Sequence, residues 1–379
     1  MSLQNIKAVV LVAALVLVLF GGTEVGAQET SVPDVGARAW TIVDLRTGEP
    51  LAGENADERL PMASTTKIML AFLTLEEANL EREVVVSRKA ASFAVPPYSN
   101  VGLFPGDTVS VRGLLMASLI ASGDDAAYAL AEDLGGGSVE QCVGEMNRRA
   151  KALGLEDTHF ENPVGFDAPD HHSSARDLAK LTRLAFAYPE FREIVATAEA
   201  EFTTQDRSIP LVNTNELLFT YELATGVKTG TTPAAGPSLV AAGASGNESY
   251  VTVVLDDEER FADTRMLLDH GFETYDRRPL ILENRQYGRV DVPYRRGETI
   301  GLVAKNSVPG LVDGSSEVER EVAVDEDLPD SLRPGDQLGT ITAKVNGEPV
   351  GETPLVARRG YEKASLGEKL WYTVEGVIE

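Results

Sequence analysis

The sequence predicts an α+β fold joined to a second, smaller domain of β-structure. The first part of the chain has the pattern of a hairpin, then several helices, then strands and a last helix, rather than a strict alternation of strands and helices. After Arg277-Arg278-Pro279 the pattern changes to short β-like runs separated by turns. A chain of 379 residues is also long for a single hydrophobic core. We therefore expect an antiparallel sheet with helices on its faces over residues 34–277, a β-sandwich-like domain over 280–361 and a helical tail over 362–379.

Hydrophobic periodicity predicts the elements of the first domain. Residues 39–44 are rich in β-formers and lead through a turn to Leu51, which predicts a hairpin. The segment 62–79 is apolar on nearly every side, and a helix of that kind is buried. Further helices are expected over 111–120, 126–134, 139–153, 175–187 and 261–275, and further strands over 199–204, 208–212, 237–244 and 250–255.

Short strands and turn residues predict the second domain. The strand-like runs cover 287–292, 299–304, 318–324, 337–345 and 354–357. The turns that punctuate them are Pro309-Gly310, Asp313-Gly314 and Asn346-Gly347, of which the last is a strong hairpin signal.

The tail after residue 361 has a helical stripe of apolar residues that includes Leu366, Leu370 and Trp371. Its polar positions are mostly acidic, whereas helices that bind anionic lipid are normally basic. Peripheral contact with a membrane and packing against the β-domain are therefore both open.

The first residues predict export. Lys7 precedes an apolar run over 8–20, and Val25 and Ala27 have the small-residue pattern of a cleavage site. We expect a signal peptide over 1–27, with an uncleaved membrane anchor as the alternative. In both cases the rest of the chain lies outside the cytoplasmic membrane.

Charge and composition exclude several classes of function. A net charge of −25 repels nucleic acid, so no nucleic-acid partner is expected. The four histidines lack metal-site spacing with a carboxylate, so we expect neither a metal nor a cofactor. Cys142 is the only cysteine and is spaced helically with Val139 and Met146, which predicts a buried apolar side chain.

Three short strings occur in one order: Ser64-Thr65-Thr66-Lys67, Ser122-Gly123-Asp124 and Lys228-Thr229-Gly230. The first lies at the start of a predicted buried helix, where i and i+3 spacing brings the hydroxyl and the amine onto one face. The second lies in a loop between two predicted helices, and the third on the strand before a hairpin.

These residue types suit acyl transfer through a covalent intermediate. A serine hydroxyl is a weak nucleophile and needs a neighbouring base. Lys67 can be that base only when its amine is neutral, which burial and a nearby cation such as Lys228 favour. Ser122 can relay a proton to the leaving amine. Catalytic roles are therefore expected for Ser64, Lys67 and Ser122.

With their flanking sequences, the three strings resemble the low-molecular-weight penicillin-binding proteins, the serine D-alanyl-D-alanine carboxypeptidases of peptidase family S11. The matching flanks are 60–64, 159–163, 173–179, 213–215, 226–230 and 267–272. The resemblance implies a β-lactamase/transpeptidase-like catalytic domain in the bacterial cell envelope, which removes the terminal D-alanine from peptidoglycan stem peptides. It also implies covalent inhibition by β-lactams.

The resemblance also implies roles in substrate binding. The backbone N–H groups of Ser64 and Thr231 would form the oxyanion hole. Lys228 and Thr229, in the same motif as Gly230, would hold the terminal carboxylate of the substrate. Arg260 is a further candidate for that carboxylate, with a surface ion pair to Glu258 or Glu259 as the alternative.

The middle motif departs from the family pattern, which has asparagine where this chain has Asp124. An ionised carboxylate only accepts hydrogen bonds, and its charge near Lys67 favours the protonated amine. Either Asp124 points elsewhere, for instance to cap the next helix as Asp125 also could, or the enzyme works slowly or with a shifted pH optimum. We expect a working but slower enzyme.

Two other functions are compatible with parts of this pattern. A class A β-lactamase shares the serine and lysines but needs a glutamate to activate the deacylating water, and no Glu-x-x-Leu-Asn string lies between Ser122 and Lys228. A non-catalytic module that binds penicillin or peptidoglycan would keep the site without turnover, and only Asp124 supports it.

Overall fold

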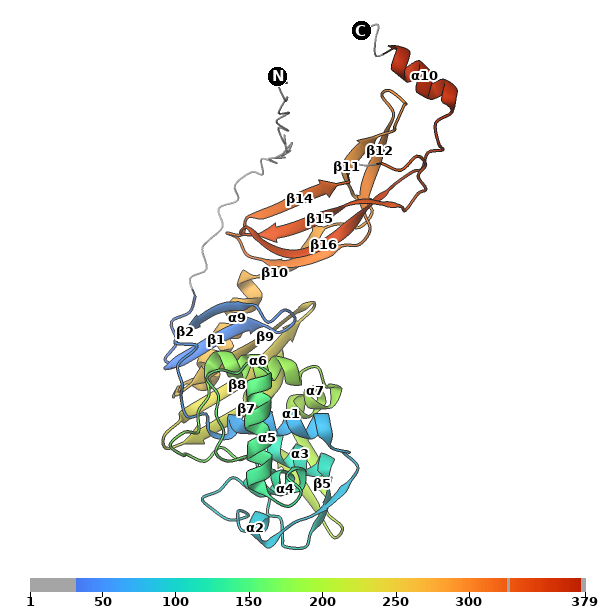
Figure 1. The fold of residues 1–379 in the computed structure, drawn as a ribbon. Helices are drawn as coiled ribbons and strands as arrows, with labels where there is room; N and C mark the ends of the chain where they lie inside the picture. The colour runs from blue at the N-terminus through green and yellow to red at the C-terminus, as the bar shows by residue number, and fades with distance from the viewer. Residues whose placement is uncertain (1–31, 326–327, 376–379) are drawn as a thin grey trace, which may run out of the picture.

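The computed structural model describes residues 32–325 and 328–375, and the signal peptide predicted over 1–27 lies outside them (Figure 1). The predicted α+β fold is confirmed. A five-stranded antiparallel sheet has the strand order β2-β1-β9-β8-β7. Its strands are β1 (Ala39–Asp44), β2 (Pro50–Glu54), β7 (Ala224–Thr232), β8 (Gly236–Ser245) and β9 (Glu248–Leu255).

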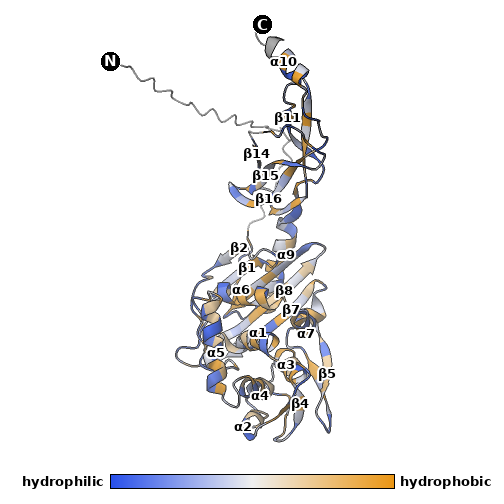
Figure 2. Ribbon diagram, turned by 45° about the vertical axis from the view of Figure 1, so that its right-hand side comes forward, coloured by the Kyte–Doolittle hydropathy of each residue, from blue (hydrophilic) through white to orange (hydrophobic). Residues whose placement is uncertain are grey.

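Both faces of this sheet are buried, which explains why its central strands are almost entirely apolar. On β9, Val253 belongs to the core that the sheet shares with the helices between β2 and β7 in the chain. Val254 belongs to the core formed with Leu267 and Leu268 of α9 (Arg260–Thr274). Successive side chains of a strand point to opposite faces, so one strand supplies both cores. Figure 2 shows apolar residues concentrated in the sheet and in the helices that pack on it.

The helices of the other layer surround α1, whose residues from Lys67 to Thr74 are all buried. The predicted buried position of Cys142 on α5 is confirmed, and burial raises the pKa of its thiol to about 12. The helices are η1 (Ala63–Thr66, a 3-10 helix), α1 (Lys67–Glu77), α2 (Arg88–Ala91), α3 (Val111–Leu119), α4 (Asp124–Leu134), α5 (Val139–Ala152), α6 (Ala175–Ala185), α7 (Pro189–Ala196) and α8 (Leu217–Thr220). Two small antiparallel two-stranded sheets accompany them, β3 (Glu83–Val85) with β4 (Thr108–Ser110) and β5 (Glu199–Thr203) with β6 (Ser208–Val212).

The second domain is a sandwich-like pair of sheets, as predicted. One sheet has the order β11-β12-β16-β15-β14, and the other pairs β10 with β13. Leu280 and Val308 from the small sheet share a core with Ile300 and Ile341 from the large one. The strands are β10 (Asp276–Ile281), β11 (Gln286–Asp291), β12 (Thr299–Ala304), β13 (Val308–Val312), β14 (Val318–Val324), β15 (Gln337–Val345) and β16 (Glu348–Ala357).

The turn expected at Pro309-Gly310 is wrong. Both residues lie within β13, where Pro309 pairs with Pro279 and Gly310 with Arg278. Proline cannot donate to a ladder, but a two-stranded sheet has only edge strands, and these tolerate it. The hairpin expected at Asn346-Gly347 is confirmed, with positive φ at both residues (52° and 84°).

Buried contacts join the two domains. Arg277 on β10 forms an ion pair with Asp44 on β1, and the two side chains are only 7% and 0% exposed. Leu311 on β13 packs into the core on the α9 side of the sheet. The last helix, α10 (Leu366–Glu375), lies at the end of the molecule remote from the first domain (Figure 1). Within the described residues, no helix is both long and apolar enough to cross a membrane.

Candidate active site

Ser64 lies in η1, directly before α1, so the helix predicted over 62–79 is a short 3-10 turn followed by an α-helix that ends at Glu77. Ala63, which precedes Ser64, has a positive φ of 48°. A non-glycine residue in this region is strained, and surrounding contacts must hold it. One of them is Thr66, whose hydroxyl donates to the carbonyl of Ala63 at 2.8 Å.

A buried histidine supports the same turn. His171 Nδ1 accepts from the backbone N–H of Glu161 at 3.0 Å, so the proton is on Nε2, which donates to Thr66 Oγ1 at 2.8 Å. Burial, together with the neighbouring histidines, lowers the pKa of His171 to about 4. The ring is therefore neutral at physiological pH and holds Thr66 in place.

Two glycines let other segments approach Ser64 closely. A Cβ on Gly230 of β7 would lie 3.0 Å from the Ser64 nitrogen, and one on Gly165 would lie 2.0 Å from the Ala63 oxygen. Gly165 also has φ of +99°. A side chain at either position would displace the turn that carries Ser64.

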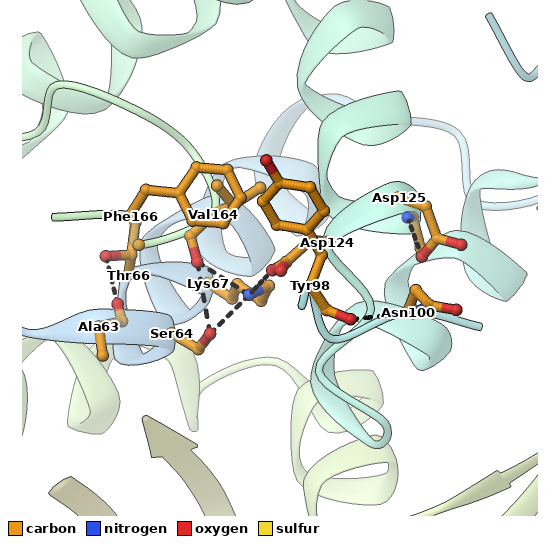
Figure 3. Close-up of polar contacts among 12 residues, drawn as sticks. Ala63, Ser64, Thr66, Lys67, Tyr98, Asn100, Asp124, Asp125, Val164 and Phe166 are labelled. Atoms are coloured by element: carbon orange, nitrogen blue, oxygen red, sulfur yellow. Dashed lines mark hydrogen bonds and ion pairs between the residues drawn. The ribbon is translucent and has the colours of Figure 1, made fainter. Parts of the chain in front are cut away.

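The Lys67 amine is the centre of the site (Figure 3). Its Nζ donates to Ser64 Oγ, to Asp124 Oδ1 and to the carbonyl oxygen of Val164, each at 2.8 Å. The side chain is 0% exposed. Burial lowers the pKa of Lys67, and the carboxylates of Asp124 and then Asp125 act against that shift by favouring the charged amine. The expected contact between Ser64 and Lys67 is thus present.

Asp124 faces Lys67, so the alternative in which it points elsewhere and caps a helix is wrong. The residue that caps α4 is Gly123, without a side-chain hydrogen bond. The Ala126 N–H in the first turn of α4 donates to Oδ1 of Asp125 at 2.9 Å. Its carboxylate accepts from the backbone N–H groups of Val101 and Leu103 at 3.0–3.2 Å and so holds the preceding loop. A glycine before α4 leaves both carboxylates free for these contacts.

Ser122 is buried between α3 and α4 with a positive φ of 59°. In the part of the chain that the structure describes, its hydroxyl makes no hydrogen bond, so no hydrogen bond joins it to Ser64 or Lys67. The Gly123 N–H donates to the Ala117 carbonyl at 3.0 Å and ties this loop to the end of α3. The structure therefore joins Ser64, Lys67 and Asp124 directly and leaves the Ser122 hydroxyl free to turn.

Lys228 and Thr229 lie on β7. Lys228 is 1% exposed and donates to the Thr229 carbonyl at 3.0 Å. Burial, and then the charge of Lys67, hold the pKa of Lys228 well below its ordinary value. The Thr229 hydroxyl contacts that of Thr214 at 2.6 Å, and the Thr214 N–H donates to the Ile120 carbonyl at 3.1 Å. Thr214 thereby links the third motif to the segment before the second.

Arg260 reaches the end of β7 from the start of α9. Its Nη1 donates to the Gly230 carbonyl at 2.9 Å and to Thr231 Oγ1 at 2.8 Å. Burial lowers the pKa of this guanidinium, and Glu216 and Asp257 oppose the shift. Among the described residues it forms no ion pair with Glu258 or Glu259, so that alternative is wrong.

The comparisons with known proteins agree with this geometry. A family model for D-alanyl-D-alanine carboxypeptidase matches residues 26–259, more than half of the chain. The chain belongs to the D-alanyl-D-alanine carboxypeptidase family. A second model, for the C-terminal domain of penicillin-binding protein 5, matches residues 275–363 and covers the β-domain.

Individual members of the family match over most of their length. The chain is 34% identical to the D-alanyl-D-alanine carboxypeptidase DacC of Escherichia coli, over 94% of this chain and 92% of the relative. It is 32% identical to DacF of Bacillus subtilis, over 87% of each. Penicillin-binding protein 5 of Haemophilus influenzae superposes with a TM-score of 0.67 at 26% identity, over 87% of this chain and 99% of that one. The DD-transpeptidase of Streptomyces K15 gives 0.61 at 35% identity, over 64% and 98%.

Several residues that shape the site of this carboxypeptidase family member were not among the predicted site residues. They are Val164, which offers only a backbone carbonyl, and Asn162, whose Oδ1 accepts from the N–H groups of Gly165 and Phe166. Thr214 and His171 belong to the same group. Asn162 and Thr214 lie in the flanking stretches 159–163 and 213–215, which resemble the family, and this resemblance is the sequence feature that could have identified them as site residues. The carbonyl of Val164 has no sequence signature.

Replacement of Gly165 tests whether the turn around Ser64 must be held this closely. Gly165→Ala should lower the rate of acylation by a fluorescent penicillin roughly 100-fold, because small displacements of reacting groups have effects of that size. The matched control is Gly144→Ala on α5, where an added Cβ meets nothing within 4 Å. The control should keep the rate and gain about 0.5–1 kcal/mol in unfolding free energy. Equal rates for both variants would contradict the close packing around Ser64.

Proposed function

We propose that this protein is a serine D-alanyl-D-alanine carboxypeptidase that removes the terminal D-alanine of peptidoglycan stem peptides through an acyl-enzyme on Ser64. The observation that carries the proposal is the buried Lys67 amine, 2.8 Å from the Ser64 hydroxyl. The family membership supports the same activity.

The contacts of Lys67 suit it as the base. When the amine is neutral, its two N–H groups can donate to Asp124 and to the Val164 carbonyl, which leaves its lone pair to accept the Ser64 proton. Ser64 Oγ then attacks the carbonyl of the penultimate D-alanine, and the proton passes to the leaving amine through Ser122. Water hydrolyses the ester in a second step.

The groups on β7 suit the rest of the substrate. Lys228, Thr229 and Arg260 gather positive charge and hydroxyl groups at one end of the site, where they would hold the terminal carboxylate. Gly230 lets the strand approach Ser64, and the N–H groups of Ser64 and Thr231 would then face the same oxyanion. Burial lowers the pKa of Lys228. The negative charge of the substrate carboxylate would favour the protonated form of this amine.

The alternatives receive less support. The β-domain and the family matches over both domains favour a carboxypeptidase over a class A β-lactamase. The non-catalytic alternative rested on Asp124, and the contact of this residue with Lys67 is compatible with turnover in the neutral form of the amine.

Covalent labelling together with product release tests the activity. The wild type should carry a penicillin adduct on Ser64 and release D-alanine from a stem-pentapeptide analogue, because both reactions use the same acyl-enzyme. Ser64→Ala should lose both. Thr65→Ala, one residue away, keeps the Ser-Lys pair and should retain the adduct. An adduct on another residue would contradict the mechanism, and an adduct without D-alanine release would favour the binding module.

We further propose that Asp124 slows acylation at neutral pH. Its carboxylate raises the pKa of Lys67 against the lowering effect of burial, so a smaller fraction of the amine is neutral. An asparagine could accept the same hydrogen bond without the charge.

Asp124→Asn should therefore move the acidic limb of the acylation-rate profile to lower pH. A displacement of one pH unit corresponds to about 1.4 kcal/mol in the free-energy difference between the charged and neutral forms of the amine. At pH values below the midpoint of the limb, it would raise the rate roughly tenfold. Asp133→Asn, at the other end of α4, makes the same change of charge at an ion pair with Arg82 and should leave the profile in place. A profile that is unchanged in Asp124→Asn would show that the charge is no handicap.

Family members act on peptidoglycan outside the cytoplasm. We propose that α10, in the tail, adds peripheral contact with the membrane. Leu366, Leu370 and Trp371 are 86%, 71% and 67% exposed. Tyr372 meanwhile contacts Tyr294 of the β-domain, with ring centroids 5.8 Å apart. One side of the helix is thus attached to the domain and an apolar side is exposed, which suits an interfacial helix. We also propose that the chain consists of a signal peptide over 1–27, a catalytic domain over 34–277, a β-domain over 280–361 and a helical tail over 362–379.

Vesicle binding tests the role of α10. Substitution of both Leu370 and Trp371 by glutamate should weaken cosedimentation with phosphatidylcholine vesicles roughly tenfold or more, because each buried apolar side chain contributes about 1.5–3 kcal/mol. Phe104→Glu, at an aromatic residue that is 60% exposed in the first domain, is the control. Equal binding of wild type and double variant would exclude α10 as the contact.

A further inference from the structure

The turn between β7 and β8 is attached to the loop that contacts Ser64. Asp167 lies in that loop, and its carboxylate accepts from the Thr232 hydroxyl and, at 3.0 Å, from the backbone N–H of Ala234. Thr232 ends β7, and Ala234 lies in the turn to β8. The Thr232 hydroxyl also accepts from the N–H of Ala235 at 3.1 Å. One carboxylate therefore holds the turn at two points, and we call these two contacts of Asp167 the Asp167 tether.

The two segments that the Asp167 tether joins both contact the turn that carries Ser64. Gly165 of the loop and Gly230 of β7 each approach the backbone nitrogen of Ser64, and a Cβ on these glycines would lie 2.7 and 3.0 Å from it. The tether connects the two segments to each other directly after Thr231. The loop, the end of β7 and the Ser64 turn are therefore fixed relative to one another.

The sheet register shows where the backbone N–H of Thr231 points. Thr231 pairs with Pro237 of β8, which has no N–H, and the Pro237 carbonyl accepts from the N–H of Asp257 at 2.8 Å. Asp257 follows β9, so the backbone of Pro237 points toward β9 and away from β7. In such a pair the backbone groups of both residues point away from each other. Because β7 is an edge strand, the Thr231 N–H points out of the sheet, as a donor of an oxyanion hole must.

We propose that Asp167 is a positioning residue for the oxyanion hole, which fixes the direction of the Thr231 N–H relative to that of Ser64. The inference rests on the proposed carboxypeptidase function. Donors of an oxyanion hole are effective because they already point at the place where charge develops. Arg260 holds the carbonyl of the residue before Thr231, and the Asp167 tether holds the residue after it. Both neighbours of Thr231 are thus fixed, although its own N–H is free for the substrate.

The test measures acylation of the full chain by a fluorescent penicillin. Asp167→Ala should lower the acylation rate constant about tenfold, which is less than the roughly 100-fold lost when a donor of the hole is removed outright. The dissociation constant of the noncovalent complex should change less than about twofold, because the oxyanion forms only during the reaction. Asp167→Asn should keep the rate, since an amide can accept from the N–H of Ala234 and donate to the Thr232 hydroxyl oxygen.

Two further measurements separate positioning from a loss of structure. Infrared spectra of the acyl-enzyme, formed with penicillin labelled at its β-lactam carbonyl, report on the hole, because hydrogen bonds to an ester carbonyl lower its stretching frequency. That frequency should rise in Asp167→Ala and stay in place in Asp167→Asn. Thr232→Val removes one partner of the same carboxylate and should also slow acylation. If both residues act through the Asp167 tether, the double variant should be no slower than Asp167→Ala.

The matched control is Asp170→Ala, further along the same loop, which removes a carboxylate that lies beside His159 and His172. The control should leave the rate and the carbonyl frequency unchanged. Equal acylation by the wild type and Asp167→Ala, or an unchanged carbonyl frequency in that variant, would overturn the proposal.

Equal losses in Asp167→Asn and Asp167→Ala would also overturn the proposal, because the charge of Asp167 would then matter rather than the tether. The same holds for an equal loss in Asp170→Ala, which would show a general effect of the loop. All of these results leave the carboxypeptidase function standing. A wild type that forms no adduct on Ser64 would instead overturn the proposed function itself.

Discussion

The burial of the Lys67 amine is the constraint on which the site depends. An ammonium group taken out of water is stabilised only by close partners, and Lys67 has three acceptors within 2.8 Å, from α4, η1 and the loop at Val164. These three segments are remote in sequence, so the packing of the helices must bring them together. The same burial lowers the pKa of the amine. A lysine that is ordinarily protonated can then act as a base.

The surroundings of Ser64 are strained in a way that fits this constraint. Ala63 and Ser122 both have positive φ, and glycine occupies the positions where β7 and the loop at Gly165 approach η1. A positive φ at a residue other than glycine costs of order 1–3 kcal/mol, and this conformation persists where neighbouring contacts determine it. Here the contacts include the His171–Thr66–Ala63 series and the buried core around α1. The apolar core therefore supports the geometry of the polar site.

Much of this arrangement could be predicted from the sequence, because the motifs are local. The i and i+3 spacing of Ser64 and Lys67 directly implied their contact, and the strand before the 237–255 hairpin placed Lys228 correctly. The direction of Asp124 could not be predicted, since it depends on how α4 packs against α1. The Pro309-Gly310 segment is part of a strand and not the predicted turn, because turn composition and edge-strand composition overlap. Backbone partners such as the Val164 carbonyl lie beyond sequence patterns altogether.

The central claim is that Lys67 is held in an environment that favours its neutral form. The most direct measurement is the titration of the Lys67 side chain itself, followed by NMR of isotope-labelled lysine and assigned by comparison with Lys67→Arg. The account predicts that Lys67 titrates below the ordinary lysine value of about 10.4. It also predicts that the midpoint falls further in Asp124→Asn, because the remaining cause, burial, is then less opposed. Titration of Lys67 at or above the ordinary value in the wild type would contradict its role as the base.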